Sequence, residues 1–216
     1  MRSFKKLFMS PYKNKFFITF FLFSLSLDAQ YEIYINYESG FEYQSQVILA
    51  KNLQNELSKK RIVNLIKKQD WIDNYSITFK PFQKKVFINI KNKNPFFVLN
   101  SEYFYDKELA RFKYDQSSNN LIKVYGDISE IEDVLFLIEL VESNKLMNLK
   151  IDRIEYSFVN GWDVKTNSIL IRFGKDITQQ RVKNFKDTMN YVYDIKKIPS
   201  IIDMRYRDGV ALSYGK

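Results

Sequence analysis

A short apolar run near the start of the chain constrains its folding most strongly, because the run decides on which side of a membrane the rest folds. Residues 16–27 read FFITFFLFSLSL and carry no charge. Five basic residues and no acidic one precede the run, and Lys13 and Lys15 stand closest to it. A basic stretch followed by an apolar one is the order of an export signal, and the positive-inside rule keeps the lysines in the cytoplasm. The chain from Asp28 onward is then predicted to lie outside.

The apolar run alone leaves open whether it is retained. Its twelve residues would form a helix of ~18 Å, whereas a hydrocarbon core is ~30 Å thick. Ala29 offers a small residue before a cleavage point, so a cleaved signal peptide competes with an anchor. A core helix of a cytosolic protein is disfavoured, because such a helix would show a polar face. The residues of a membrane anchor would be Phe16, Phe17, Ile18, Phe20, Phe21, Leu22, Phe23, Leu25 and Leu27.

The absence of Cys and His limits the chemistry of the chain. None of the 216 residues is either type, which excludes Ser-His-Asp and Cys-His catalysis, the usual zinc sites, disulfides and redox thiols. No glycine-rich phosphate loop or metal-ligand spacing occurs. An enzyme would depend on acid pairs, and such pairs are common by chance: Asp70/Asp73, Glu130/Glu132 and Asp203/Asp208. We therefore predict no enzyme, no catalytic residue, no cofactor, no metal and no small-molecule substrate.

The net charge of +9 does not predict a nucleic-acid partner. Five of the nine excess charges lie in the first 27 residues. Lys outnumbers Arg 26 to 8, whereas nucleic-acid sites favour Arg and gather it on one face. The basic clusters at 59–61 and 67–68 suit the solvated side of a helix.

The first part of the exported chain alternates like a small α+β unit. Residues 32–37 (EIYINY) alternate as a strand, and residues 43–57 carry helical spacing. Ser58 is a candidate N-cap for a second helix, which ends before Trp71. Two alternating strands follow at 75–79 and 85–91, with Pro81 in their turn. The order β-α-α-β-β predicts two helices on one face of a sheet.

The second part predicts a sheet with flanking helices. A capping box at 129–132 precedes a helix, and a further helix begins at about Thr178. The predicted strands are 150–158, 163–165, 169–173, 201–206 and 210–214. Asp208-Gly209 between the last two predicts a β-hairpin. Because the last strand ends the printed sequence, we expect it at the edge of its sheet.

Several segments, in this order, resemble the bacterial FtsQ/DivIB cell-division family. They are 67–72 (KKQDWI), 79–91 (FKPFQKKVFINIK), 93–98 (KNPFFV), 171–176 (IRFGKD) and 202–211 (IDMRYRDGVA). The last is the most specific, since it follows the family pattern IDLRYPNGFAV. One departure is Asp70, which stands where the family has Pro.

The resemblance implies a fold with defined domains. It implies an α+β chain with a cytoplasmic tail (1–15), a retained transmembrane signal anchor (16–30), a POTRA domain (31–95) and a β domain with a mixed sheet and flanking helices (96–216). At the join, residues 96–99 (FFVL) are expected to run as a buried connection between the two domains.

The resemblance also implies a function. It implies a non-enzymatic divisome scaffold of the inner membrane, at the septum, with its bulk in the periplasm, where it binds FtsB and FtsL and helps control septal peptidoglycan synthesis. One alternative is an exported POTRA-type binding or chaperone module for envelope proteins. Another is a cell-wall enzyme built on carboxylates.

The partner site is expected at the last strand. A strand without Pro, inward charge or bulge at a sheet edge is either an aggregation hazard or a binding site, and the resemblance favours binding of an FtsB segment. The predicted partner-binding residues are Arg205, Tyr206, Asp208, Gly209, Val210, Ala211, Leu212, Ser213 and Tyr214.

Overall fold

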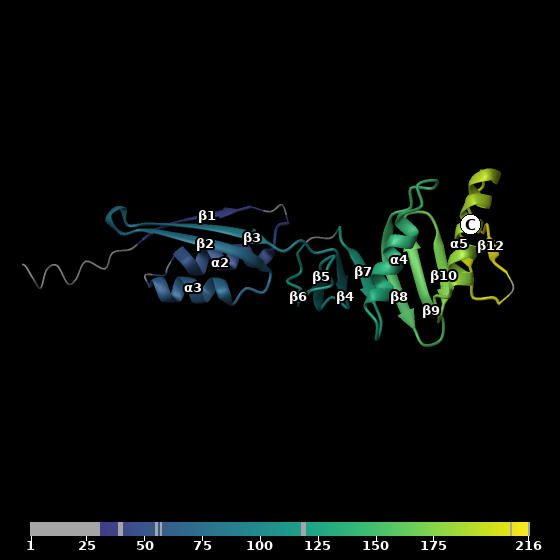
Figure 1. The fold of residues 1–216 in the computed structure, drawn as a ribbon, viewed down its shortest axis with the longest axis horizontal. Helices are drawn as coiled ribbons and strands as arrows, with labels where there is room; N and C mark the ends of the chain where they lie inside the picture. The colour runs from purple at the N-terminus through teal and green to yellow at the C-terminus, as the bar shows by residue number, and fades with distance from the viewer. Residues whose placement is uncertain are drawn as a thin grey trace, which may run out of the picture.

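The computed structural model shows an elongated molecule in which two sheets follow one another along the long axis (Figure 1). It describes residues 31–38, 41–54, 56, 58–117, 120–207 and 209–215. The predicted tail and anchor, residues 1–30, lie outside the described residues. Within the described part, no helix is long and apolar enough to cross a membrane. The expected α+β class with mixed sheets is confirmed.

The first sheet has three strands in the order β1-β3-β2. β1 runs parallel to β3, and β2 runs antiparallel to it. Apolar side chains of α2 and α3 pack on one face of this sheet, against Val86, Ile88 and Ile90 of β3. The elements are β1 (Glu32–Tyr37), α2 (Gln44–Gln54), α3 (Lys59–Lys67), β2 (Ile72–Lys80), the 3-10 turn η1 (Pro81–Gln83) and β3 (Lys85–Asn92).

The predicted β-α-α-β-β order is confirmed. The bounds of β1 are those predicted, and β2 begins earlier than expected, at Ile72. Ser58 is the N-cap residue of α3, but its side chain makes no capping hydrogen bond.

The second sheet has nine strands in the order β12-β11-β10-β9-β8-β7-β4-β5-β6. Three pairs of neighbouring strands are parallel (β4 with β7, β7 with β8, β10 with β11) and the other five are antiparallel, so the sheet is mixed. Its strands are β4 (Phe97–Leu99), β5 (Tyr103–Tyr105), β6 (Arg111–Lys113), β7 (Ile122–Tyr125), β8 (Ile151–Ser157), β9 (Gly161–Thr166), β10 (Leu170–Gly174), β11 (Ile201–Asp203) and β12 (Ala211–Ser213).

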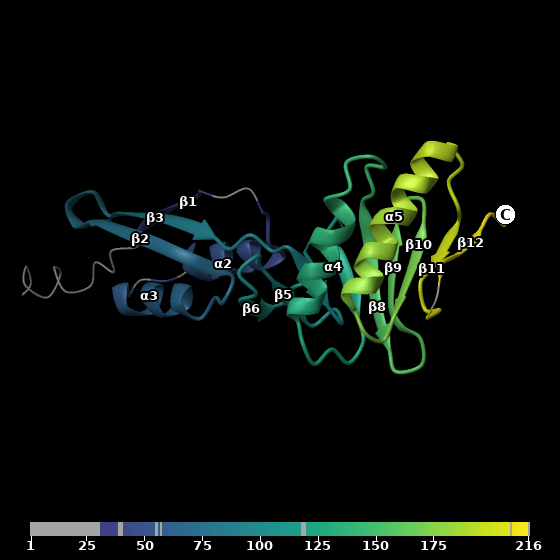
Figure 2. The same ribbon diagram turned by 45° about the vertical axis from the view of Figure 1, so that its right-hand side comes forward.

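Helices α4 (Glu132–Glu142) and α5 (Gln179–Ile195) lie on the same side of this sheet (Figure 2). Leu137 and Ile138 of α4 and Phe185 and Met189 of α5 form one core with alternate residues of the strands. Helix α5 begins after Thr178, as predicted, and Thr178 caps it, because its side chain accepts a hydrogen bond from the Arg181 amide (3.3 Å).

Two local predictions in this half fare differently. The predicted capping box at 129–132 does not form, because α4 begins after Ile131 and no side chain caps it. The hairpin predicted around Asp208-Gly209 is confirmed, because β11 pairs antiparallel with β12. Both strands are shorter than predicted, since the pairing ends at Asp203 and Ala211. After β11 the Asp203 carboxylate accepts the Arg205 backbone N–H (3.1 Å), a local bond typical of turns.

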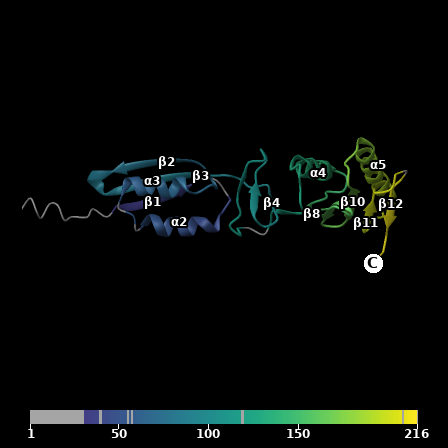
Figure 3. The ribbon, with the colours of Figure 1, turned by 90° about the horizontal axis from the view of Figure 1, so that it is seen from below.

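Strand β4 joins the two halves by giving one face to each. Figure 3 shows β4 between the two groups of elements. Phe97 belongs to the core under α4 and α5, whereas Val98 belongs to the core of the first sheet. Both are buried, at 0% and 6% exposure, and Phe96 and Leu99 are half-buried. The expectation of a buried connection is therefore confirmed. Because successive side chains of a strand point to opposite faces, neighbouring residues of β4 pack in two different cores.

Polar contacts fasten the same junction. The amides of Gln44 and Ser45, at the start of α2, donate to Ser117 Oγ (2.7 Å) and Asp115 Oδ2 (2.8 Å). The Lys113 amide donates to Asp70 Oδ2 at 2.8 Å. Asp70, which departs from the family pattern, thus accepts a bond from the second sheet.

Candidate partner-binding edge

The last strand of the chain lies at an edge of the second sheet (Figure 2). β12 pairs antiparallel with β11, and no strand of the described chain pairs with its other side. The paired residues are Ile201 with Ser213, Ile202 with Leu212 and Asp203 with Ala211. An edge strand leaves a row of backbone N–H and C=O groups free to pair with another chain.

The two faces of β12 differ. Leu212, like Val210 before it, is partly buried against the core. Ala211 and Ser213 are exposed on the opposite face. Tyr214 is 39% exposed, and the Lys197 Nζ lies 4.4 Å from the centre of its ring. A strand added here would therefore meet larger apolar side chains on one face and the small side chains of Ala211 and Ser213 on the other.

Arg205 is held in place by Asp203. Its guanidinium donates to the Asp203 carboxylate from Nε (2.9 Å) and Nη2 (2.6 Å), and to Asn160 Oδ1 from Nη1 (3.2 Å). Asp203 is 8% exposed. The hydrogen bonds from Arg205 lower the pKa of Asp203 below its ordinary value, although burial opposes the shift. The pair fixes the start of the β11–β12 connection.

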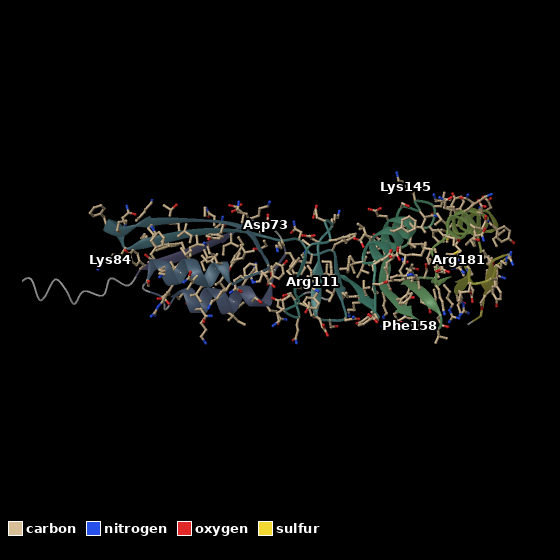
Figure 4. All side chains as sticks on the ribbon, turned by 60° about the horizontal axis from the view of Figure 1, so that its bottom comes forward. Asp73, Lys84, Arg111, Lys145, Phe158 and Arg181 are labelled. Carbon is tan, nitrogen blue, oxygen red and sulfur yellow. The ribbon has the colours of Figure 1, made fainter. Side chains whose placement is uncertain are left out.

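A groove of about 970 Å³ lies between α5 and the β11–β12 connection. Its lining residues include Arg181, Tyr191, Arg205, Tyr206, Val210 and Leu212. Both tyrosines of this lining are solvent-exposed, Tyr191 at 55% and Tyr206 at 60%. The label on Arg181 in Figure 4 marks the α5 side of the groove. Aromatic rings and arginines in one concave surface are typical of protein-binding sites.

The structure brings most of the predicted partner residues together at this groove and edge. Arg205, Tyr206, Gly209, Val210 and Leu212 line the groove. Ala211 and Ser213 lie in β12, and Tyr214 follows it. The predicted residue Asp208 lies outside the described residues.

The contribution of α5 was missed from the sequence. Arg181 and Tyr191 line the groove from this helix. One signal could have found Tyr191: it lies off the apolar stripe that ends in Met189 and Val192, and so cannot belong to the buried face.

Three of the acids in the pairs that an enzyme would need have structural partners. Asp70 accepts the Lys113 amide, Asp73 forms an ion pair with Lys91 (2.9 Å), and Asp203 binds Arg205. Over the ranges that the structure describes, no group of three or more acidic residues is arranged to hold a metal ion.

A comparison of the sequence with models of protein families finds one matching family. The family model described as cell division protein FtsQ/DivIB, C-terminal, matches residues 97–205. This chain belongs to the FtsQ/DivIB family. The match begins at β4 and ends at Arg205, so residues 31–96 and β12 lie outside it. No curated protein sequence matches the chain.

Membership in FtsQ/DivIB indicates a role in cell division. The family consists of non-enzymatic scaffolds that interact with other divisome proteins. The resemblance drawn from the sequence motifs is thereby confirmed at the level of the family.

Proposed function

We propose that this chain is a divisome scaffold of the inner membrane that binds FtsB, together with FtsL, through β12 in the periplasm and so helps control septal peptidoglycan synthesis. The observation that carries the proposal is the unpaired outer side of β12 beside an aromatic groove. A partner segment would add a strand next to β12. Main-chain hydrogen bonds then supply affinity, and alternate side chains supply specificity.

The groove beside β12 supplies that specificity. Three arginines line the groove (Arg181, Arg205 and Arg207), against two aspartates (Asp176 and Asp187). The excess of positive charge favours a partner segment with acidic side chains. Tyr206 lines the groove and is 60% exposed, so a bound partner could bury it as an aromatic anchor.

Binding of a periplasmic FtsB segment to two variants tests the proposed site. Tyr206→Ala is expected to cost ~2 kcal/mol or more, as at interface hot spots. A chain truncated after Gly209 lacks β12 and is expected to lose binding. Phe158→Ala is the matched control, because this exposed ring (69%) lies in the β8–β9 turn, outside the groove. Undiminished affinity in both folded variants would contradict the proposal.

We also propose that residues 16–30 are a retained signal anchor, that 31–95 form a POTRA domain and that 96–216 form the β domain. Five basic residues before the apolar run support a cytoplasmic N-terminus. Mass spectrometry of the native protein is expected to find no mature N-terminus at Gln30. Replacing Lys13 and Lys15 by Glu is expected to weaken the orientation, as read by topology reporters on both ends.

A further inference from the structure

The tip of the β2–β3 turn carries a fully exposed phenylalanine. Phe82 lies in η1 and its side chain is 104% exposed. Its neighbours Pro81 and Gln83 are also exposed. A single exposed apolar side chain is common on soluble proteins, so the surroundings of Phe82 decide whether it has a role.

The surroundings of Phe82 are basic. Lys80 precedes the turn, and Lys84 and Lys85 follow it. The Lys59 Nζ lies 4.9 Å from the ring centre of Phe79, so the first residue of α3 adds its charge at the same end of the sheet. Lys85 pairs with Glu32 at 3.8 Å. Within the described ranges, the other three lysines form no ion pair with a carboxylate.

The turn lies beside the start of the described chain. The Glu32 amide donates to the Lys84 carbonyl at 2.8 Å, and Glu32 pairs with Lys85 in the parallel β1–β3 ladder. In Figure 1 the turn between β2 and β3 is at the opposite end of the molecule from β12, and the label on Lys84 in Figure 4 marks it. Four residue steps separate Tyr31 from Leu27, the last residue of the apolar run. Fully extended, those steps span ~14 Å, so the turn cannot lie far from the end of that run.

We propose that the β2–β3 turn docks on an anionic phospholipid bilayer, with Phe82 among the headgroups and Lys80 and Lys84 beside the phosphates. The proposal rests on the proposed membrane anchor at residues 16–30, which brings the turn to the bilayer. Aromatic rings flanked by lysines favour the boundary between headgroups and acyl chains. The positive turn also complements the negative surface of anionic lipids.

The absence of cysteine from the chain provides a clean reporter. In the full-length protein, Gln83→Cys places a single environment-sensitive NBD dye beside Phe82. The protein is reconstituted in vesicles of phosphatidylethanolamine and phosphatidylglycerol, or of phosphatidylcholine alone. We expect a blue-shifted emission and quenching by nitroxide lipids in the anionic vesicles. Lys80→Gln and Lys84→Gln are each expected to lower the ratio of docked to undocked turn about fivefold. Phe82→Ser is expected to reverse the blue shift.

A matched reporter and a flotation assay separate the outcomes. Val159→Cys carries the same dye in the β8–β9 turn, which also has an exposed phenylalanine, Phe158, but no lysine. The emission of the dye at position 159 is expected to remain that of a water-exposed dye in both kinds of vesicle. If the protein floats with the vesicles after a carbonate wash but the dye at position 83 stays in water, docking is overturned and the anchor stands. A protein that does not float overturns both. A shift that is equal in neutral vesicles, or that survives loss of both lysines, also overturns the proposal.

Discussion

Asp115 is the residue that couples the two halves most directly. Its carboxylate accepts hydrogen bonds from the Ser45 amide and hydroxyl (2.8 and 2.7 Å), and another from the Ser117 hydroxyl. Burial raises the pKa of Asp115, but the hydrogen bonds from Ser117 and Ser45 outweigh burial, so its pKa lies below the ordinary value. The Asp115 carboxylate therefore caps the N-terminus of α2 by accepting these hydrogen bonds, although it belongs to a loop far along the chain.

Asp115→Ala is predicted to destabilise the protein by about 0.5–2 kcal/mol, the usual cost of losing a helix cap. Urea unfolding measures the change. Asp73→Ala is the control, because its ion pair with Lys91 is exposed on both sides and such pairs contribute about 1 kcal/mol or less. Equal effects of the two substitutions would contradict the capping role.

The Asp203–Arg205 pair predicts a pH dependence of the β11–β12 connection. Because the hydrogen bonds of Arg205 lower the pKa of Asp203, the pair stabilises the fold above the ordinary carboxyl pKa of ~3.9. That stability is lost as the pH falls through the lowered value. The NMR shift of the Arg205 amide, which donates to Asp203, should therefore titrate below pH ~3.9.

Asp203→Asn is the control for this titration, since an amide accepts the same bond but does not ionise. Asp163, which lies nearby on β9, should titrate separately, because burial raises its pKa above the ordinary value despite the opposing charges of Arg172 and Arg205. An Arg205 shift that persists unchanged in Asp203→Asn would assign the titration to another group.

Among the elements, β12 makes the sharpest prediction. Successive backbone N–H groups of a strand point to opposite sides, so Ala211 and Leu212 donate in opposite directions. Ala211→Pro and Leu212→Pro should therefore differ: one removes an outward donor and weakens FtsB binding, and the other removes a bond to β11 and lowers stability. Calorimetric binding and thermal unfolding of both variants check this. Equal binding by both stable variants would exclude strand addition.

Long, strongly patterned elements could be predicted from the sequence, whereas the short strands β5 and β6 could not. β1 and α5 were found because six alternating residues or four helical turns leave a clear period. Strands β5 and β6 have three residues each, too few for a period, and no prediction included them. The capping box failed at α4 because the motif is local, whereas the start of the helix depends on packing of the apolar residues after Ile131.

The candidate site could be predicted only along its own strand. The residues from Tyr206 to Tyr214 follow one another, so a motif and an edge argument reach them. Arg181 and Tyr191 reach the groove only because α5 packs beside β11, which no local pattern encodes. The hydrogen bonds that the first residues of α2 donate to Asp115 and Ser117 join residues seventy or more positions apart. They could not be predicted from a local sequence pattern either.

At the scale of the whole molecule, the two sheets are predicted to move as one body. Val98, Phe104 and Phe112 of the second sheet lie in the core of the first, and two aspartates bond across the junction. NMR relaxation should give one correlation time for residues of both sheets. Combining Asp70→Ala with Asp115→Ala should loosen the junction and separate the two times, whereas Asp73→Ala should not. Independent tumbling of the unsubstituted protein would contradict this view.

The two-faced strand β4 also sets an order of folding. Synthesis proceeds from the N-terminus, and the first elements of a chain emerge before the later ones. Residues 31–95 therefore emerge without Val98, Phe104 and Phe112, which complete their core, and without the carboxylate that caps α2. Residues 31–95 therefore need the chain up to Ser117 to complete their core and the cap of α2. We expect them to reach their final packing only after the start of the second sheet has been synthesised.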